Sequence, residues 1–404
     1  MFNVLTRLPG IAVLFFIFPK MKNELGLDDF GEGLAAVALA AIVAFPLTGL
    51  NAATRRLIAF PHASGDQAAQ ADSFVSALIS SAIFATSSGV VAIISGFILH
   101  YKPEQLYCCA IIAAISYTNV IDNIRLAFNE HYVTAALQLL FQAATFGVML
   151  LVDFGSIGVV LSFVLLSAHT LAASLVTGAV LVVQRPYLLS GKPRSLRECF
   201  RSGMLNGSSD TLVVGALNVA VVWLGAQSGP QAAAWLGTLS RVFQLALLPV
   251  MLMVVPLTSF ISSRWALLSA HGRRTMNLAL ALLAGTVGMG AAIGIYFGAR
   301  FYSVRILETP QFGGQLLYLC LTFAFSAVVL QRFYSLMVYS IERGSHYAII
   351  STIAGVSAIA ALLGVGAVQS SEAALTALCC LLGGVLVGGT VLDVLRRGRK
   401  LALE

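Results

Sequence analysis

Apolar residues in this chain form runs of about 20 to 26 residues, and short polar segments separate the runs. A helical run of that length spans the roughly 30 Å hydrocarbon layer of a bilayer. None of the runs shows the two-residue alternation over about ten residues that a membrane barrel strand requires. The pattern therefore predicts an all-α polytopic membrane protein.

Twelve transmembrane helices are predicted, in two sets of six. The first set covers residues 4–19, 33–60, 74–99, 104–128, 131–152 and 155–183. The second covers residues 202–225, 231–263, 275–299, 315–341, 347–368 and 373–395. The most basic internal segment lies between the sets. We therefore predict an N-terminal six-helix bundle (1–183), a cytoplasmic basic linker (184–201), and a C-terminal six-helix bundle with a short basic tail (202–404).

Composition agrees with this interpretation and narrows the function. Hydrophobic residues make up 58% of the chain and charged residues 10%, and the mean hydropathy is +0.90. The predicted loops leave no room for a soluble catalytic domain, and no glycine-rich phosphate loop is present. We expect a membrane transporter rather than an enzyme or an ATP-driven pump, with no nucleic-acid partner and no metal site.

Basic residues are distributed unevenly between the alternate loops. If the N-terminus is cytoplasmic, sixteen lysines and arginines fall on the cytoplasmic side and five on the opposite side. Because basic loops tend to stay in the cytoplasm, both termini and the linker are predicted to be cytoplasmic. The five residues on the opposite side are Lys20, Lys22, Lys102, Arg300 and Arg305.

Several arginines lie within predicted spans or at their ends, where a central charge costs roughly 2.5–3.5 kcal/mol on insertion. Arg241, some ten residues into the eighth span, is the deepest charge, and Arg332 lies in the tenth span. Each either faces an aqueous cavity and contacts an anion or forms a structural ion pair. Arg7, Arg55 and Arg56 lie near the inner ends of the first two spans. They are either substrate contacts or anchors whose side chains extend to the interface.

Two acidic residues are singled out within spans. Asp122 lies three residues before Arg125 on one helix face, which predicts a structural ion pair between them. Asp210 lies in the polar run 206–211 of the seventh span. It is either a counter-ion for one of the arginines or a site for a coupling H⁺ or Na⁺.

The predicted interior is therefore cationic, with Arg7, Arg241 and Arg332 against Asp210. A cavity of that sign attracts anions, and arginine binds phosphate through two parallel hydrogen bonds. Lipid-linked pyrophosphate is a substrate with this chemistry.

Two stretches also carry a family resemblance. In the first, Leu-Gly at 25–26 and Phe-Gly at 30–31 precede a long second span that ends on the basic pair 55–56. In the second, a polar seventh span precedes an eighth span with the early Arg241 and the late Pro256. Both stretches resemble Wzx-type flippases for lipid-linked oligosaccharides, a branch of the MATE-like exporter superfamily.

The resemblance implies alternating access between two six-helix bundles in a bacterial inner membrane. The implied cargo is an undecaprenyl-pyrophosphate-linked oligosaccharide repeat unit, moved from the inner to the outer leaflet for O-antigen or exopolysaccharide biosynthesis. By position, Arg7, Arg55, Arg56 and Arg241 match basic positions of such flippases, and Arg332 is added on depth alone. Implied partners are the lipid-linked oligosaccharide, the bilayer, a polysaccharide polymerase and a chain-length regulator. No cofactor is implied beyond a coupling H⁺ or Na⁺.

Other functions share parts of this pattern. A MATE-type cation-coupled multidrug antiporter has the same fold, but it would need acidic residues in the cavity to hold organic cations. A membrane-embedded enzyme would need paired catalytic residues on a sizeable loop. The sequence leaves open a non-transporting scaffold of the polysaccharide assembly machinery.

Overall fold

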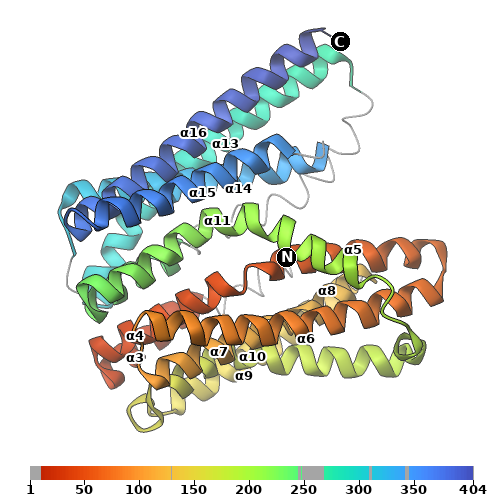
Figure 1. Cartoon of the computed structure of the whole chain (residues 1–404), viewed down its shortest axis with the longest axis horizontal. Helices are drawn as coiled ribbons and strands as arrows, with labels where there is room; N and C mark the ends of the chain where they lie inside the picture. Colours follow the sequence, from red (N-terminus) through yellow and green to blue (C-terminus); the bar gives the residue numbers. More distant parts are fainter. Residues whose placement is uncertain are drawn as a thin grey trace. The chain divides into compact units, whose positions relative to one another are not determined.

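The structure is a computed structural model that describes residues 11–128, 130–243, 247, 268–308, 312–341 and 345–403. Within these ranges, side chains are not described at 52, 131–132, 205–211, 270, 336–341, 345–346 and 400–403. The described part of the chain is built from helices and contains no strand (Figure 1).

The helices follow the predicted spans closely in sequence. Up to residue 228 they are η1 (Val13–Ile17, a π-helix), α3 (Phe18–Leu25), α4 (Leu27–Val43), α5 (Pro46–Ser64), α6 (Gln67–Ile98), α7 (Pro103–Ser116), α8 (Asn119–Ala127), α9 (His131–Leu151), α10 (Phe154–Gln184), η2 (Pro186–Ser190, a 3₁₀ helix) and α11 (Leu196–Ser228). After Gly229, residues 230–243 are helical. The remaining elements are α13 (Ala270–Phe301), η3 (Tyr302–Ile306, a π-helix), α14 (Gln315–Ile341), α15 (Ser345–Gly366) and α16 (Ser371–Leu403).

Length and apolarity allow many of these helices to cross a bilayer. Within the described residues, eight helices meet both conditions, and the α4–α5 pair, bent by 48°, is either a ninth, broken span or a re-entrant segment. The bend falls at Pro46, which has no N–H to donate to the preceding turn, so the predicted span 33–60 is broken there. Large apolar side chains such as Phe97 and Leu151 are exposed, as expected for a lipid-facing surface.

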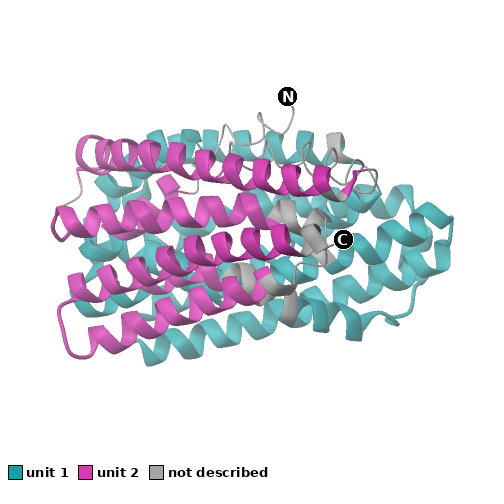
Figure 2. Ribbon diagram, turned by 90° about the horizontal axis from the view of Figure 1, so that it is seen from above, with its two compact units in different colours: residues 1–211, 221–234 teal, residues 212–220, 235–404 magenta. Residues whose placement is uncertain are grey.

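The chain divides into two compact units (Figure 2). The N-terminal unit comprises residues 1–211 and 221–234, and the C-terminal unit comprises residues 212–220 and 235–404. The sequence places the boundary in the segment 184–201 instead. In the structure α11 begins inside that segment and contributes residues to both units.

The basic segment 184–201 packs into the N-terminal unit rather than standing apart from it. Leu188 and Cys199 are fully buried in the core of this unit, with Phe74, Tyr117 and Ile124 among their cluster. Three of its hydrogen bonds reach the first turns of α6. These contacts are Tyr187 Oη to Gln70 Oε1 at 2.6 Å, Lys192 N to Asp72 Oδ1 at 2.6 Å, and Ser195 N to Ser76 Oγ at 3.0 Å.

Aromatic and polar contacts join the helices of the C-terminal unit. The ring of Phe243 stacks on Phe325 of α14 with centroids 4.5 Å apart. Tyr334 of α14 donates a 3.0 Å hydrogen bond to Asp393 of α16. Tyr347 of α15 lies 2.7 Å from Thr390 of α16 through their hydroxyl oxygens. α16 is therefore held from two sides.

Gly191 tests the packing of the basic segment against α6. A Cβ atom at this position would lie 2.1 Å from the carbonyl oxygen of Ala71, and backbone cannot move aside as a flexible side chain can. We expect Gly191→Ala to lower the stability of the purified protein by about 1–3 kcal/mol, measured as a lower midpoint of thermal unfolding in detergent. Gly147→Ala on α9 is the control, since no atom lies within 4 Å of its added Cβ. Equal midpoints for both variants would contradict this packing.

Candidate functional site

The two deep arginines predicted from the sequence both lie in the C-terminal unit. Arg241 is on the 230–243 helix, about 16 Å along the axis from its first residue at 1.5 Å per residue. Arg332 is on α14, seven residues after Phe325, so these two residues share a helix face. Both arginine side chains are half-buried. The Phe243–Phe325 stack fixes the two helices against each other near these positions.

Acidic residues of the same unit lie near its ends or are already partnered. Its described acidic residues are Glu308, Glu372 and Asp393. Glu372 is in the first turn of α16 and accepts a 2.7 Å hydrogen bond from the Gly314 N–H. Asp393 is buried, and Arg397 Nε lies 2.6 Å from its Oδ2. Asp393 is therefore paired with Arg397, and Arg241 and Arg332 are the two predicted site arginines of this unit.

Asp393 is a buried acidic residue that was not predicted from the sequence. It lies inside the predicted span 373–395, four residues before Arg397. That i, i+4 spacing is the signal by which the pair could have been found.

Asp122 and Arg125, which the sequence predicts to form an ion pair, have other hydrogen-bond partners in the structure. Asp122 is buried on α8, and its Oδ2 accepts hydrogen bonds from Gln138 of α9 at 2.9 Å and Ser174 of α10 at 3.5 Å. Arg125 instead pairs with Glu130, its Nε 2.6 Å from Oε2. The i, i+3 spacing brings the Cβ atoms together, but the long arginine side chain extends past the end of α8 to a carboxylate beyond it.

Asp122 forms the centre of a buried polar cluster in the N-terminal unit. Thr177 of α10 interacts with its carboxylate, yet the Thr177 hydroxyl and Asp122 Oδ1 have no hydrogen-bond partner. Gln142 Oε1, one turn beyond Gln138 on α9, is also buried and unpaired. A carboxylate surrounded by oxygen atoms from three helices can take up a proton or a small cation.

Glu130 joins two arginines at one end of the same unit. Arg185 Nη2 lies 2.6 Å from Glu130 Oε1, and the Arg185 guanidinium lies 4.3 Å from the centre of the Phe128 ring. Burial disfavours ionisation of Glu130, but hydrogen bonds from Arg185 and Arg125 outweigh this and lower its pKa. The Glu130 carboxylate therefore connects α8, α9 and the residue that follows α10.

Arg55 and Arg56 lie on exposed positions of α5. Arg56 Nη2 is 2.5 Å from Glu198 Oε1 of α11, and Arg194 Nη1 is 3.4 Å from Asp72 Oδ2 of α6. An open pocket of about 430 Å³ lies between these pairs, and Phe60 forms part of its wall. The guanidinium groups of Arg56 and Arg194 are solvent-accessible and ion-paired, which fits anchors at the interface as well as contacts to an anionic headgroup.

Two predicted site residues cannot be placed. Arg7 lies outside the described residues, and so does the side chain of Asp210 on α11. Among the others, the structure brings Arg241 and Arg332 into one unit. It places Arg55, Arg56, Asp122 and Arg125 in the other.

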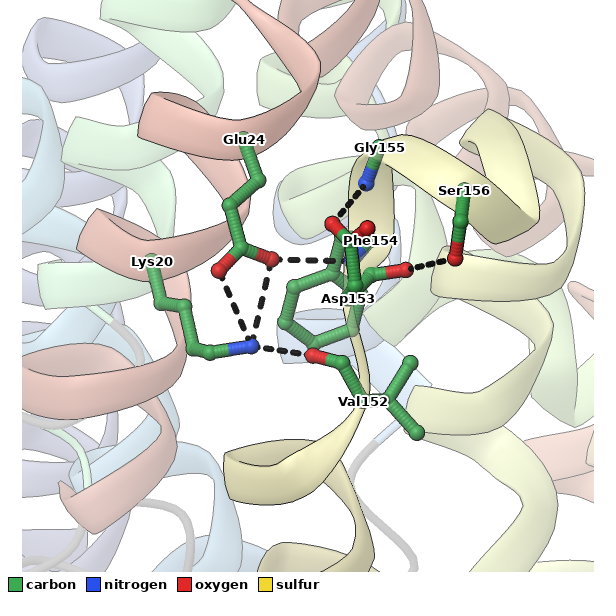
Figure 3. Close-up of polar contacts among 7 residues, drawn as sticks. All are labelled: Lys20, Glu24, Val152, Asp153, Phe154, Gly155 and Ser156. Carbon is green, nitrogen blue, oxygen red and sulfur yellow. Dashed lines mark hydrogen bonds and ion pairs between the residues drawn. The ribbon is translucent and has the colours of Figure 1, made fainter.

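A lysine–carboxylate cluster holds the opposite end of the N-terminal unit (Figure 3). Lys20 of α3 pairs with Glu24 at 3.1 Å, donates to the Val152 carbonyl, and lies 4.6 Å from the centre of the Phe154 ring. Glu24 Oε2 in turn accepts from the Phe154 N–H at 2.8 Å. Asp153 caps α10 through the Gly155 N–H at 3.1 Å. These contacts tie α3 to the turn between α9 and α10.

Comparison with known proteins identifies the fold. No protein-family model matches this chain, and no curated protein matches it in sequence. A multidrug resistance MATE family transporter of the MOP superfamily, solved in an inward-facing conformation, matches with a TM-score of 0.70 and 15% identity over 99% of this chain and 98% of that one. The chain has the MATE-like fold. This fold has twelve transmembrane helices in two bundles, so the predicted fold class is confirmed and the chain is a multi-pass membrane protein.

Two further structures with this fold are similar to the chain. A eukaryotic MATE transporter matches with a TM-score of 0.63 and 11% identity over 99% of this chain and 96% of that one. A MOP superfamily transporter from Pyrococcus furiosus matches with a TM-score of 0.57 and 15% identity over 99% of this chain and 98% of that one. That protein is described as having a binding pocket of reversed polarity, which suggests a different function. At such identities, the likeness extends to the fold alone.

The Glu130 contacts give a prediction about stability and pH. Glu130→Gln removes the carboxylate that faces the fully buried Arg125, and we expect a loss of about 3 kcal/mol in a thermal unfolding measurement at pH 7. Because the folded pKa of Glu130 is lowered, its stabilising effect is complete above the unfolded pKa near 4.5 and is lost as the pH falls through the folded pKa. The difference between wild type and variant should therefore shrink at acidic pH.

Glu104→Gln is the matched control for this experiment, since Glu104 is an exposed glutamate in the first turn of α7. It should unfold like wild type at every pH. A Glu130→Gln variant as stable as wild type at pH 7 would show that Arg125 does not depend on this carboxylate.

Proposed function

We propose that this protein is a flippase that moves undecaprenyl-pyrophosphate-linked oligosaccharide repeat units from the inner to the outer leaflet by alternating access. The observation that carries the proposal is the positive charge inside the C-terminal unit. Arg241 and Arg332 are half-buried within it, while its one deeply buried described carboxylate, Asp393, is held by Arg397 and Tyr334.

A charged side chain inside a membrane protein costs free energy. Its sign therefore indicates the charge of the group or ligand that it contacts. Arg241 and Arg332 lie half-buried on packed helices. A pyrophosphate offers several oxygens that accept paired hydrogen bonds from guanidinium groups. A lipid-linked pyrophosphate could therefore lower the cost of keeping these arginines in the bilayer while it crosses.

The fold alone does not determine the cargo. The sign of the charge in the interior is the property that distinguishes the candidate cargoes. The similar structures include multidrug MATE transporters as well as the Pyrococcus furiosus protein with its pocket of reversed polarity. The same fold thus accommodates pockets of different sign. A cationic interior favours an anionic cargo over an organic cation.

One observation favours a second function, a cation-coupled multidrug antiporter. Asp122 is 2% exposed, and its Oδ1 has no hydrogen-bond partner. A buried carboxylate of this kind suits H⁺ or Na⁺ coupling, and it is also what an organic cation would need. Asp210 also remains a proposed coupling residue. Cation coupling at Asp122 would be compatible with either cargo.

We further propose a bacterial inner-membrane location with both termini in the cytoplasm. The uneven distribution of basic residues supports this orientation. A polysaccharide polymerase and a chain-length regulator are the proposed protein partners, because the flipped repeat unit must be polymerised after it crosses.

Complementation of a bacterial strain that cannot flip its lipid-linked repeat unit tests this function. We expect wild type to restore surface polysaccharide and Arg241→Ala to reduce it at least tenfold, since a charge-assisted hydrogen bond contributes about 1.5–3 kcal/mol. Arg241→Lys should restore part of the activity, because it keeps the charge and loses the paired geometry.

Arg305→Ala is the control, because Arg305 is an exposed arginine of η3 in the same unit. All variants must reach the membrane at equal levels on an immunoblot. Full export by Arg241→Ala would remove this residue as a substrate contact, and failure of the wild type to complement would argue against the proposed cargo.

A further inference from the structure

A second site lies at the end of the C-terminal unit where α13 ends and α14 begins. It is a partly open pocket in which the centres of water-sized molecules can occupy about 80 Å³. Helix 230–243, α13, α14 and the turn before α14 all contribute to its wall. The residues that define it are Trp235, Tyr296, Arg300, Phe312, Gln315 and Tyr318.

Aromatic rings line this pocket in two pairs. The rings of Trp235 and Phe312 have centroids 5.9 Å apart and are tilted by 48°. The rings of Tyr296 and Tyr318 meet edge to face, 5.8 Å apart. Arg300 lies one helical turn after Tyr296 on α13 and interacts electrostatically with Tyr318. The pocket therefore combines flat apolar surfaces with one positive charge.

Two hydrogen-bonding groups at this pocket are buried and unpaired. Trp235 is 1% exposed, and its Nε1 has no hydrogen-bond partner. The hydroxyl of Tyr318 is also buried without a partner. Buried indole N–H and phenol groups normally find partners, and leaving one unpaired costs about 1–3 kcal/mol. A ligand with hydroxyl groups would supply them.

The combination of groups identifies the class of ligand. The C–H faces of a sugar ring pack against aromatic side chains, while its hydroxyls accept from N–H groups and exchange hydrogen bonds with a tyrosine. An organic cation would also bind aromatic faces, but the positive charge of Arg300 opposes it. We propose that this pocket binds one pyranose ring of an oligosaccharide.

The position of the pocket gives it a role within the proposed function, on which this inference rests. Glu372 of α16 accepts from the Gly314 N–H beside the pocket, so the pocket lies where α16 begins, at the far end from its basic C-terminal residues. In the predicted orientation this is the outer side. The pocket would hold the glycan of the cargo where it leaves the protein.

Tryptophan fluorescence of the full chain in detergent tests the inference. Trp223→Phe and Trp265→Phe together leave Trp235 as the only tryptophan. We expect glucose, galactose, N-acetylglucosamine or glucuronate to change its emission saturably, with Kd on the order of 1 mM for a single ring. Tyr318→Phe should raise that Kd at least threefold, and Arg300→Gln should weaken glucuronate more than glucose. The control Tyr107→Phe alters an exposed tyrosine of the N-terminal unit and should have no effect.

Several outcomes would overturn the proposal. These are no saturable change up to about 100 mM of any of these sugars, an unchanged Kd in Tyr318→Phe, or saturable binding of choline in place of sugar. If the double tryptophan variant does not fold, calorimetric titration of the wild type and Tyr318→Phe replaces the fluorescence readout. Sugar binding is measured on the purified protein and export by complementation in cells, so the pocket and the flippase function can fail separately.

Discussion

Hydrocarbon offers no hydrogen bonds to a charged or polar group, and this constraint determines where the polar residues of the chain lie. Arg125 is buried because Glu130 lies at the end of its helix, and Glu130 is held in turn by Arg185. Lys20 is held by Glu24 and the Val152 carbonyl at the other end of the same unit. Against this background, the positive charge of Arg241 and Arg332 in the C-terminal unit becomes the most informative feature for function.

The same constraint links the two proposals about the C-terminal unit. Its interior presents guanidinium groups, which suit pyrophosphate, while its end presents aromatic rings and unpaired donors, which suit a sugar. A lipid-linked oligosaccharide carries both chemistries in one molecule. The N-terminal unit contributes a different group, the Asp122 cluster, whose buried carboxylate suits a coupling cation. A cationic path for the cargo and an acidic site for the coupling ion can therefore occupy separate units.

The sequence predicted the fold class and most helix positions because hydrocarbon thickness sets the length of an apolar run. The predicted span 33–60 is interrupted at Pro46, where a missing N–H breaks the helix. Contacts between segments that are distant in the sequence could not be predicted from it. The segment 184–201 reads as a linker by its charge, yet Leu188 and Cys199 are core residues. Trp235 lies near the start of a span, the usual place of an interfacial anchor, but it is buried in a pocket whose other walls come from α13 and α14.

Arg125 has Asp122 on its own helix but pairs with Glu130. The length of the arginine side chain and the end of α8 determine which acid it reaches.

Transport by the purified protein in liposomes tests the central claim, that the cationic interior selects an anionic lipid-linked cargo. Vesicles would contain either a fluorescent undecaprenyl-pyrophosphate-linked saccharide, followed by its accessibility to an impermeant quencher, or the organic cation ethidium in the lumen. The account predicts protein-dependent movement of the pyrophosphate lipid, inhibition of that movement by soluble pyrophosphate, and no protein-dependent movement of ethidium. Movement of ethidium without movement of the lipid would contradict it.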